Sequence, residues 1–401
     1  MAGVRIERAT NRGVRLRNRS ALLTRLLLDG PLTRQALSRE TGLSQPAVSN
    51  VVSDLIEDGL VAEAGALESE GGRPGILLRI APGFGAVAGI DVGETRVRAE
   101  LFDLGLRRLA CADRPIGGPA GTTPETVVRH IHAALRAVTA GRGPGEVLGV
   151  GVGVAGIVQQ GPDGAVVHAQ TLGWDAVPLQ RLLEEGTELP LHIDNGATTL
   201  GQAEMWFGAG RGRRHAVFAL VGSGIGAAVV TDGATYRGAS SSAGEWGHTT
   251  LVYGGRPCRC GSRGCLEAYV GAGSVLQRYR EHPAALELPG DDEETRIAAL
   301  LAAAGEPAAR AVLDETADYL GAGVANLLNL FNPELVVLGG WTATALAELL
   351  PRVRESAARH ALRQPFAQAR IELGRLGEDA VALGAATLPV ARLLTEGGVV
   401  S

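Results

Sequence analysis

Apolar side chains in the first sixty residues recur at the spacing of three short amphipathic helices. Leucines at positions 22, 23, 26 and 27 predict the first helix, with Ser20 as its N-cap and Gly30-Pro31 after its last turn. Thr33 is placed to cap a second helix, which ends at the turn Thr41-Gly42-Leu43, and Ser44 is placed to cap a third. Two helices joined by a three-residue turn that contains glycine are typical of a helix-turn-helix motif.

The third helix separates its apolar and polar positions as a DNA-reading helix does. Its apolar stripe consists of Val48, Val51, Val52, Leu55 and Ile56. The other side of its amino-terminal part carries Gln45, Pro46, Ser49 and Asn50. A recognition helix enters the major groove amino end first, where Gln and Asn pair with adenine and Ser with several bases. We therefore predict that these four residues contact DNA.

A wing is predicted after the third helix. Residues 60–61 begin an extended arm that returns over 76–80, and the glycine-rich tip between them carries Arg73. We expect Arg73 to reach a minor groove, whereas Glu68 and Glu70 beside it would be repelled by phosphate. The alternative interpretation is a three-helix packing or dimerisation module. The wing and the arginines before residue 20 favour a winged helix-turn-helix that binds DNA.

After a linker at 81–85, the apolar pattern changes to short runs that alternate with helical segments, which is typical of an α/β domain. The segments 87–104 and 216–231 look alike, because each has two apolar runs around a glycine-bearing turn. The turn residues of interest are Asp91, Gly93, Thr95, Gly222 and Gly224. Backbone N–H groups in such turns can approach a phosphate, although an ordinary tight hairpin has the same pattern. Two such hairpins suggest duplicated halves that face a nucleotide cleft.

Length and charge narrow the class of protein. With 401 residues and 45% hydrophobic content, the chain can form two or three domains, each with its own core. The longest candidate apolar run, 147–158, is shorter than the roughly 18 to 20 residues that span a membrane, so we expect a cytoplasmic protein with no membrane partner. The net charge of −5 hides an asymmetry, since residues 1–80 hold eleven arginines against nine acidic residues.

Three of the four cysteines lie close together, at Cys258, Cys260 and Cys265. A disulfide framework is expected in small secreted chains, so a metal site in a reducing compartment is the better interpretation. With His248, the three thiolates complete a tetrahedral set for one structural Zn²⁺, which leaves no open coordination position. The alternative is that these cysteines are simply buried.

Two carboxylates, Glu245 and Glu267, flank the cysteine cluster in sequence. A loop fixed by zinc would hold both carboxylates toward one pocket. Carboxylate oxygens accept hydrogen bonds from hydroxyl groups, and leaving a buried acceptor unpaired penalises a wrong ligand by about 1 to 3 kcal/mol. The pair therefore predicts a pocket for a sugar or another polyol.

With these motifs in place, the chain resembles the ROK family of bacterial repressors and sugar kinases over nearly its whole length. The segment 244–267, with its zinc ligands and carboxylates, carries most of the resemblance. Further motifs follow the expected order at 91–95, 193–195, 203–204, 332–334 and 339–340. The resemblance implies an actin-like, two-lobed α/β fold of the sugar kinase and ribonuclease-H type, here behind a winged helix-turn-helix. The fused DNA-binding domain places the chain among the regulators of the family.

The resemblance also suggests where the domains begin and end. We expect the winged helix-turn-helix at 1–80 and a smaller α/β lobe at 81–195 together with roughly 385–401. The larger α/β lobe, with the zinc and sugar sites, is expected at 196–384.

The residues that hold a sugar in this family correspond here to Gly156, Asn195, Glu245, His248 and Glu267, and His248 also binds zinc. The chain departs from the kinase pattern at Gly196, where family kinases place the aspartate that removes the proton from the attacking sugar hydroxyl. Loss of a general base typically lowers the rate about 10²- to 10⁴-fold, so we expect negligible phosphorylation. The turns at Asp91 and Gly222 are compatible with weak nucleotide binding or with a purely structural role.

The sequence therefore predicts a sugar-responsive transcription regulator, most simply a repressor, that binds its effector without phosphorylating it. Its expected partners are operator DNA, a sugar and further copies of itself, because paired reading heads bind half-sites about one helical turn or a multiple apart. A dimer and a tetramer both fit this expectation. Two alternatives are an active ATP-dependent sugar kinase with a fused DNA-binding domain and a zinc-responsive regulator. Sugar bound between the lobes is expected to close the cleft and change the spacing of two DNA-reading heads.

Overall fold

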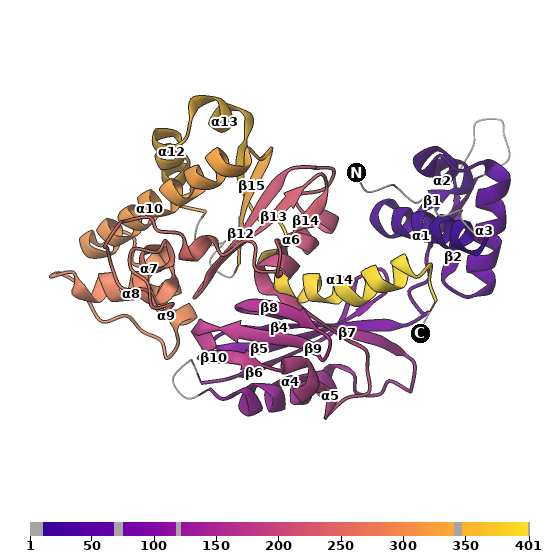
Figure 1. Ribbon diagram of the computed structural model, residues 1–401, viewed down its shortest axis with the longest axis horizontal. Helices are drawn as coiled ribbons and strands as arrows, with labels where there is room; N and C mark the ends of the chain where they lie inside the picture. The colour runs from indigo at the N-terminus through magenta and orange to yellow at the C-terminus, as the bar shows by residue number, and fades with distance from the viewer. Residues whose placement is uncertain (1–10, 68–74, 118–121, 341–346, 400–401) are drawn as a thin grey trace, which may run out of the picture.

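The computed structural model describes residues 11–67, 75–117, 122–340 and 347–399. These residues form an amino-terminal domain beside a larger body of two lobes (Figure 1). Among the described helices, none is long and apolar enough to cross a membrane.

The amino-terminal domain contains three helices and a small antiparallel sheet of order β1-β3-β2. Its elements are α1 (Asn11–Asp29), β1 (Leu32–Thr33), α2 (Arg34–Thr41), α3 (Gln45–Glu57), β2 (Val61–Leu67) and β3 (Gly75–Ile80). The predicted caps of α2 and α3 are confirmed, because the side chains of Thr33 and Ser44 accept hydrogen bonds from the third amide of α2 and α3 respectively. Strands β2 and β3 form the predicted wing. Its tip, with Arg73 and the neighbouring glutamates, lies outside the described residues.

The first helix is longer than predicted, and Ser20 is not its cap. α1 begins at Asn11, so Ser20 is an interior residue whose carbonyl accepts a hydrogen bond from the Thr24 hydroxyl. Arginine and leucine are good helix formers, and no proline interrupts residues 11–29, so the helix continues through the basic segment. The arginines at 12, 15 and 17 are exposed on this helix, whereas Arg19 is buried.

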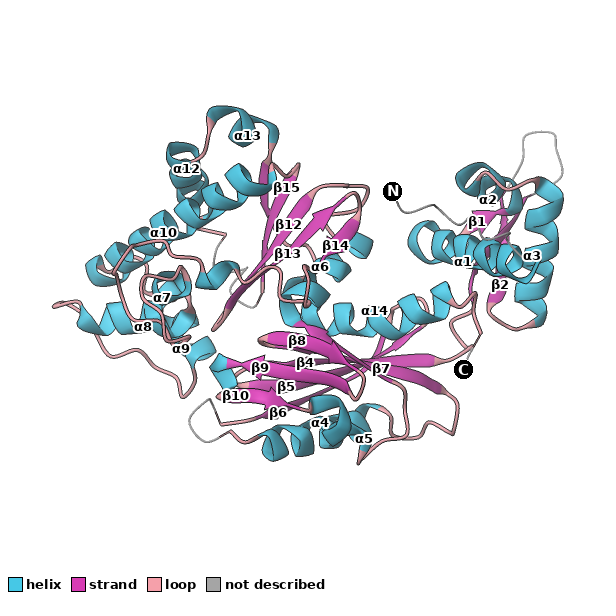
Figure 2. Ribbon diagram, viewed as in Figure 1, coloured by secondary structure: helices cyan, strands magenta, loops and turns pink. Residues whose placement is uncertain are grey.

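The first lobe is built on a five-stranded sheet of order β11-β7-β4-β5-β6. Its strands are β4 (Ala86–Val92), β5 (Arg96–Asp103), β6 (Arg108–Pro115), β7 (Val147–Val154) and β11 (Leu191–Asn195). A second sheet contains β8 (Ile157–Gly161), β9 (Gly164–Ala169) and β10 (Trp174–Val177), with the short helix η1 (Gln170–Leu172) between the last two. Helices α4 (Pro124–Val138) and α5 (Leu179–Glu184) cover the outer face of the lobe (Figure 2).

The second lobe repeats this topology. Its sheet has the order β14-β13-β12-β15-β16, so that each lobe has an antiparallel meander followed by two parallel strands. Its strands are β12 (Ala216–Val221), β13 (Ile225–Thr231), β14 (Ala234–Tyr236), β15 (Leu335–Gly339) and β16 (Arg370–Leu373). Its helices are η2 (Trp246–His248), α7 (Glu267–Val270), α8 (Ala272–Glu281), α9 (Glu293–Ala302), α10 (Pro307–Phe331), α12 (Leu350–His360) and α13 (Arg363–Gln368). The duplicated halves expected from the two hairpins are therefore present.

Two helices cross between the lobes. α6 (Gly196–Phe207) leaves the first-lobe sheet at β11 and packs on β12 and β13 of the second lobe. α14 (Ala380–Thr395) follows β16 and the short helix η3 (Gly377–Asp379), and packs on β4 and β7 of the first lobe. The two helices also pack against each other, so each lobe is anchored to an element that begins in the other.

α14 lies unusually close to the strands beneath it. A side chain at Gly89 of β4 would overlap the carbonyl oxygen of Ala382, and one at Gly151 of β7 would overlap that of Ala385. Pro389 lies four residues after Ala385 within the same helix and has no N–H to donate to that carbonyl. Glycine on the strands thus allows the backbone of the helix to contact the sheet directly.

The far end of α14 joins the DNA-binding domain to the body. Val390 and Leu394 of α14 share a hydrophobic cluster with Leu22 and Leu23 of α1. Next to them, the buried Arg19 side chain donates from Nε to the carbonyl of Gly397 at 2.6 Å and from Nη2 to Asp58 at 2.6 Å. Arg211, which follows α6, donates to the carbonyl of Leu28 at 2.6 Å and to Asp29 at 2.9 Å. The middle and the carboxyl end of α1 are therefore attached to the two-lobed body.

Substitution of Gly151 tests the backbone contact of α14. Gly151→Ala places a Cβ against the Ala385 carbonyl, and we expect the free energy of unfolding to fall by about 1 to 3 kcal/mol, as overpacking of a tight core does. Gly83→Ala is the matched control, since no atom lies within 4 Å of its added Cβ. Denaturant unfolding of the two variants measures the difference. Equal midpoints would show that the helix can move away from the strand at no cost.

Candidate functional site

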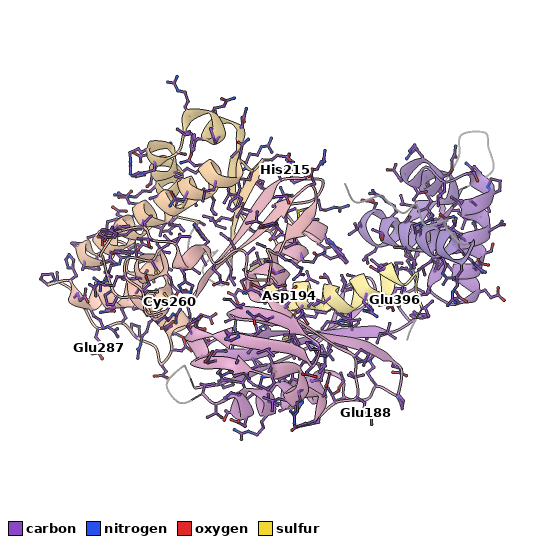
Figure 3. The ribbon with its side chains drawn as sticks, in the orientation of Figure 1. Glu188, Asp194, His215, Cys260, Glu287 and Glu396 are labelled. Carbon is purple, nitrogen blue, oxygen red and sulfur yellow. The ribbon has the colours of Figure 1, made fainter. Side chains whose placement is uncertain are left out.

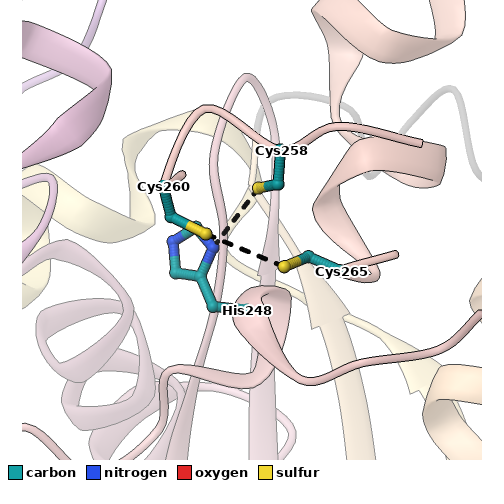
Figure 4. A group of neighbouring side chains, drawn as sticks. All are labelled: His248, Cys258, Cys260 and Cys265. Atoms are coloured by element: carbon teal, nitrogen blue, oxygen red, sulfur yellow. Dashed lines mark hydrogen bonds between the residues drawn. The ribbon is translucent and has the colours of Figure 1, made fainter. Parts of the chain in front are cut away.

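The three clustered cysteines and His248 come together in the second lobe (Figure 4). His248 ends η2, while Cys258 and Cys260 lie in the following loop and Cys265 lies just before α7. Cys258 Sγ is 3.7 Å from His248 Nδ1, Cys260 Sγ is 3.7 Å from Cys265 Sγ, and all four ligand atoms lie within 4.8 Å of one another. Thiolates about 2.3 Å from a tetrahedral Zn²⁺ lie about 3.8 Å apart, so the geometry fits such an ion.

The loop between the cysteines is held in shape by its own backbone. The amide of Cys258 donates to the carbonyl of Ser262 at 2.9 Å, and the amide of Gly261 donates to the carbonyl of Cys258 at 3.0 Å. Gly261 has a φ of 90°, a conformation that favours glycine. Burial raises the pKa of the Cys258 thiol to about 12, so a cation is needed to hold this group as a thiolate at neutral pH.

One cavity between the two lobes brings together the five residues expected to hold a sugar. Gly156 and Asn195 reach it from the first lobe, and Glu245, His248 and Glu267 reach it from the second. The turn residues from the two hairpins also line it, namely Asp91, Gly93, Thr95, Gly222 and Gly224. The cavity therefore joins residues from both halves of the body.

Asn195 is fixed at the point where β11 ends and α6 begins. Its Oδ1 accepts hydrogen bonds from the amides of Ala197 and Thr198 as the N-cap of α6, at 2.8 and 3.1 Å. Its Nδ2 donates to the carbonyl of Gly156 at 2.7 Å. Gly156 has a φ of 91°, and an added Cβ would overlap the β9 backbone at His168. The amide and the glycine turn therefore hold each other in place in the cavity wall.

Gly196 also lines the cavity, as the first residue of α6. A Cβ added there would find its nearest neighbours, the Val154 carbonyl oxygen and two methyl groups, at 3.7 to 3.8 Å. These are ordinary van der Waals distances. The glycine is therefore not required by packing, and the wall has room for a side chain.

Several buried or half-buried carboxyl groups line the cavity. Burial is the main factor that raises the pKa of Glu245, with nearby His248 opposing the shift and Glu267 adding to it. Burial also raises the pKa of Glu94, which Arg259 opposes, and raises that of Asp91 to about 7. The site thus offers several hydrogen-bonding groups that are shielded in part from solvent.

Two of the ion pairs between the lobes involve residues that line the cavity or adjoin its lining, and sequence reasoning missed both. Arg237, just after β14, binds Asp194 of β11 through two hydrogen bonds of 2.6 and 3.1 Å, at the junction of the lobes (Figure 3). Arg259, between two of the cysteines, lies between Glu94 of the first lobe and Glu267 of the second. The only feature of the sequence that points to the second of these pairs is the position of Arg259 inside the cysteine motif.

The predicted DNA-reading face of the amino-terminal domain is open to solvent. Gln45, Pro46 and Asn50 are exposed at the start of α3, and Ser49 is half-buried. The apolar stripe of α3 is buried apart from Ile56, which is half-buried. Two of the basic residues of α1 are engaged within the domain, since Arg15 and Arg19 pair with acidic residues of α3 and its C-cap.

Comparison with known proteins agrees with this division of the chain. A sequence profile described as ROK family matches residues 87–392, and one described as winged helix-turn-helix DNA-binding matches residues 15–62. The xylose repressor of Caldicellulosiruptor bescii is 31% identical over 388 residues, which cover 94% of this chain and 96% of that protein.

Two crystal structures are informative. A ROK family transcriptional regulator, described as a homolog of the E. coli MLC protein, has a TM-score of 0.76 at 24% identity and covers 96% of this chain and 98% of its own. At that identity the similarity concerns the fold. A ROK family glucokinase from Streptomyces griseus, in complex with glucose and AMPPNP, has a TM-score of 0.67 at 28% identity and covers 76% of this chain and 99% of its own.

Proposed function

The chain belongs to the ROK family and carries an amino-terminal winged helix-turn-helix, and from this premise we propose that it is a sugar-responsive, DNA-binding transcriptional repressor. One observation carries the proposal. The five residues expected to hold a sugar line one cavity, and a single helix runs from that cavity to the DNA-binding domain. The xylose repressor that is similar over nearly the whole length supports the same function.

We propose that the sugar binds between the lobes. Glu245 and Glu267 would accept hydrogen bonds from its hydroxyl groups, and the second hydrogen of Asn195 Nδ2 remains available to donate to it. His248 points Nδ1 toward the cysteines, which leaves its other ring nitrogen for a hydroxyl group. Because these contacts come from both lobes, the sugar makes all of them only when the cleft is closed. Such a ligand shifts the population toward the closed form.

We propose that no phosphoryl transfer follows. Gly196 provides no carboxylate at the position of the expected general base. In addition, the buried Glu94 lies in the turn between Gly93 and Thr95, and its carboxyl group offers no positive charge to a triphosphate. Asp91, near the end of β4, and Gly222, in the turn after β12, would then shape the cleft without supporting catalysis.

We propose that His248, Cys258, Cys260 and Cys265 hold one structural Zn²⁺ per chain. The donor set and the ligand spacing fit a closed tetrahedral site. Bound zinc would keep the thiols deprotonated and hold the loop that presents His248 to the cavity.

We propose that α14 transmits closure to the DNA-binding domain. Ala380 and Val381, at its start, line the cavity, and Leu394, near its end, packs with α1. A helix of this length spans about 24 Å, so a tilt at the cavity moves its far end. Arg19 connects that end to Asp58, which caps the carboxyl end of α3. Two or more copies, as a dimer or tetramer, would place paired α3 helices on operator half-sites, with Gln45, Pro46, Ser49, Asn50 and Arg73 at the DNA.

A sugar that binds the cavity should both stabilise the chain and change its affinity for DNA. We expect stabilisation of about 2.7 kcal/mol at a sugar concentration one hundred times Kd. Thermal shift with D-xylose, D-glucose and other aldoses identifies the sugar. Binding to a duplex selected from a random library by the full-length chain then measures the change in affinity.

Two variants make this experiment specific. Glu245→Gln should lose most of the sugar-dependent shift, whereas Glu188→Gln, an exposed residue of the first lobe, should keep it (Figure 3). If no sugar stabilises the wild-type chain, the sensing function is wrong.

The similarity to the S. griseus glucokinase makes an active sugar kinase the second candidate. We expect the wild-type chain to form no sugar phosphate from ATP above background. Gly196→Asp restores a carboxylate where the wall has room for one, and we expect a rate increase of about 10²-fold or more if the general base is the missing part. Turnover by the wild-type chain that disappears in Glu245→Gln would establish the kinase instead.

Asn50 tests the placement of the reading helix. Asn50→Ala should reduce discrimination at one base pair of the selected site by about 1 to 3 kcal/mol, because a bidentate contact with adenine is lost. Glu57→Gln, at the end of the same helix, is the control and should leave base preference unchanged. Unchanged selectivity in Asn50→Ala would mean that another surface reads the bases.

A further inference from the structure

We propose that Arg259 positions Glu267 for the sugar and ties this carboxylate to the opposite lobe through Glu94, an inference that rests on the proposed sugar-sensing function. Arg259 lies between Cys258 and Cys260, on the loop that the cysteine cluster fixes. Its side chain extends from the second lobe to Glu94 of the first lobe. Neither the general function nor the metal site requires a charged residue at this position.

The guanidinium of Arg259 satisfies three acceptors at once. Nε donates to Glu267 Oε1 at 3.0 Å, and Nη1 donates to Glu94 Oε2 at 3.1 Å. Nη2 donates to the carbonyl oxygen of Ser223, in the turn between β12 and β13. A planar fork with donors in several fixed directions is a property of arginine that lysine lacks.

Both oxygens of Glu267 are thereby held. Oε1 receives Arg259, and Oε2 receives the backbone N–H of Ile225 at 2.9 Å. The side chain is only 4% exposed, so water contributes little to its orientation. A carboxylate has about four acceptor positions, so about two remain for hydroxyl groups of a sugar. Arg259 and Ile225 thus fix the direction in which Glu267 presents its free lone pairs.

The contact with Glu94 crosses the cleft. Glu94 lies on the β4–β5 turn of the first lobe, with its side chain 5% exposed, whereas Glu267 and Ser223 belong to the second lobe. When the lobes separate, Arg259 keeps its second-lobe partners and loses Glu94. The carboxylate that binds sugar therefore stays oriented in the open form, and the ion pair with Glu94 stabilises the closed form.

This arrangement predicts different effects for substitutions of Arg259 and of Glu94. Arg259→Ala releases Glu267 and removes the cross-lobe contact, so we expect sugar affinity to fall about 10- to 100-fold, the value of one hydrogen bond to a charged group. Glu94→Gln weakens only the cross-lobe contact. We expect it to lower affinity by a smaller factor, because the orientation of Glu267 is unchanged.

The experiment uses the full-length, zinc-loaded chain and two readouts. Calorimetric titration with D-xylose and with D-glucose measures affinity, and hydrogen exchange measured by mass spectrometry reports the protection of the Ile225 amide without sugar. We expect Arg259→Ala to lower this protection and Glu94→Gln to retain it. The double variant should bind sugar no more weakly than Arg259→Ala alone, because the Glu94 contact is already lost.

Two further variants separate the role of the Arg259 side chain from the effect of its charge alone and from the effect of any substitution in this loop. Arg259→Lys keeps the charge but not the fork, so its affinity should lie between those of the wild type and Arg259→Ala. Arg263→Gln changes an exposed arginine of the same loop and should behave as wild type. The zinc content of every variant shows whether the loop is intact. If Arg259→Ala loses zinc, the sugar affinities of Arg259→Lys and Glu94→Gln test the role of Arg259 instead.

The outcomes separate this inference from the proposed function. If the wild type binds neither sugar but Arg259→Ala loses Ile225 protection, the positioning of Glu267 stands and the identity of the ligand is at fault. If the wild type binds sugar and both Arg259 variants bind it equally well with unchanged Ile225 protection, the positioning role is wrong. If Glu94→Gln binds sugar as tightly as the wild type, the cross-lobe role is wrong.

Discussion

The contact between α14 and the first-lobe sheet is made by backbone as well as by side chains. Gly89 and Gly151 lie beneath the carbonyls of Ala382 and Ala385, so the helix rests on the strands without intervening Cβ atoms. Close-packed backbone leaves little room for sliding, because any shift creates overlap or a void. Since the first turn of α14 lines the cavity and its last turns pack on α1, this contact fixes how the cavity and the DNA-binding domain are placed relative to each other.

The chemistry of the cavity follows from an excess of carboxyl groups that are largely shielded from solvent. Glu94 and Glu267 both bind one guanidinium, that of Arg259, and Glu245 lies near Glu267. Buried acceptors without partners are costly, and a neutral polyol satisfies several at once without adding charge. A nucleotide would instead bring more negative charge to the same surface. Together with Gly196, this excess of carboxyl groups supports our proposal that the cavity binds a sugar without phosphorylating it.

Local signals predicted many parts of the structure. The helices after Thr33 and Ser44 are specified by caps that act within three residues, and the two hairpins by glycine turns between apolar runs. Ser20 misled the prediction of α1, because a residue that can cap a helix can also lie inside one when the residues before it are good helix formers. The cysteine motif likewise predicted its own cluster, since its ligands lie within eighteen residues of one another.

By itself the sequence determined the class of each domain, the cluster of three cysteines and one histidine, and the carboxylates beside it, because periodicity, caps and short motifs act over a few residues. The tertiary structure alone decided which distant residues meet. Arg259 and Glu94 are 165 residues apart, and Arg19 and Gly397 are 378 residues apart. No local preference encodes such pairs. They form because duplicated lobes face each other across a cleft and α14 returns the chain to the first lobe, where burial makes each missing partner costly.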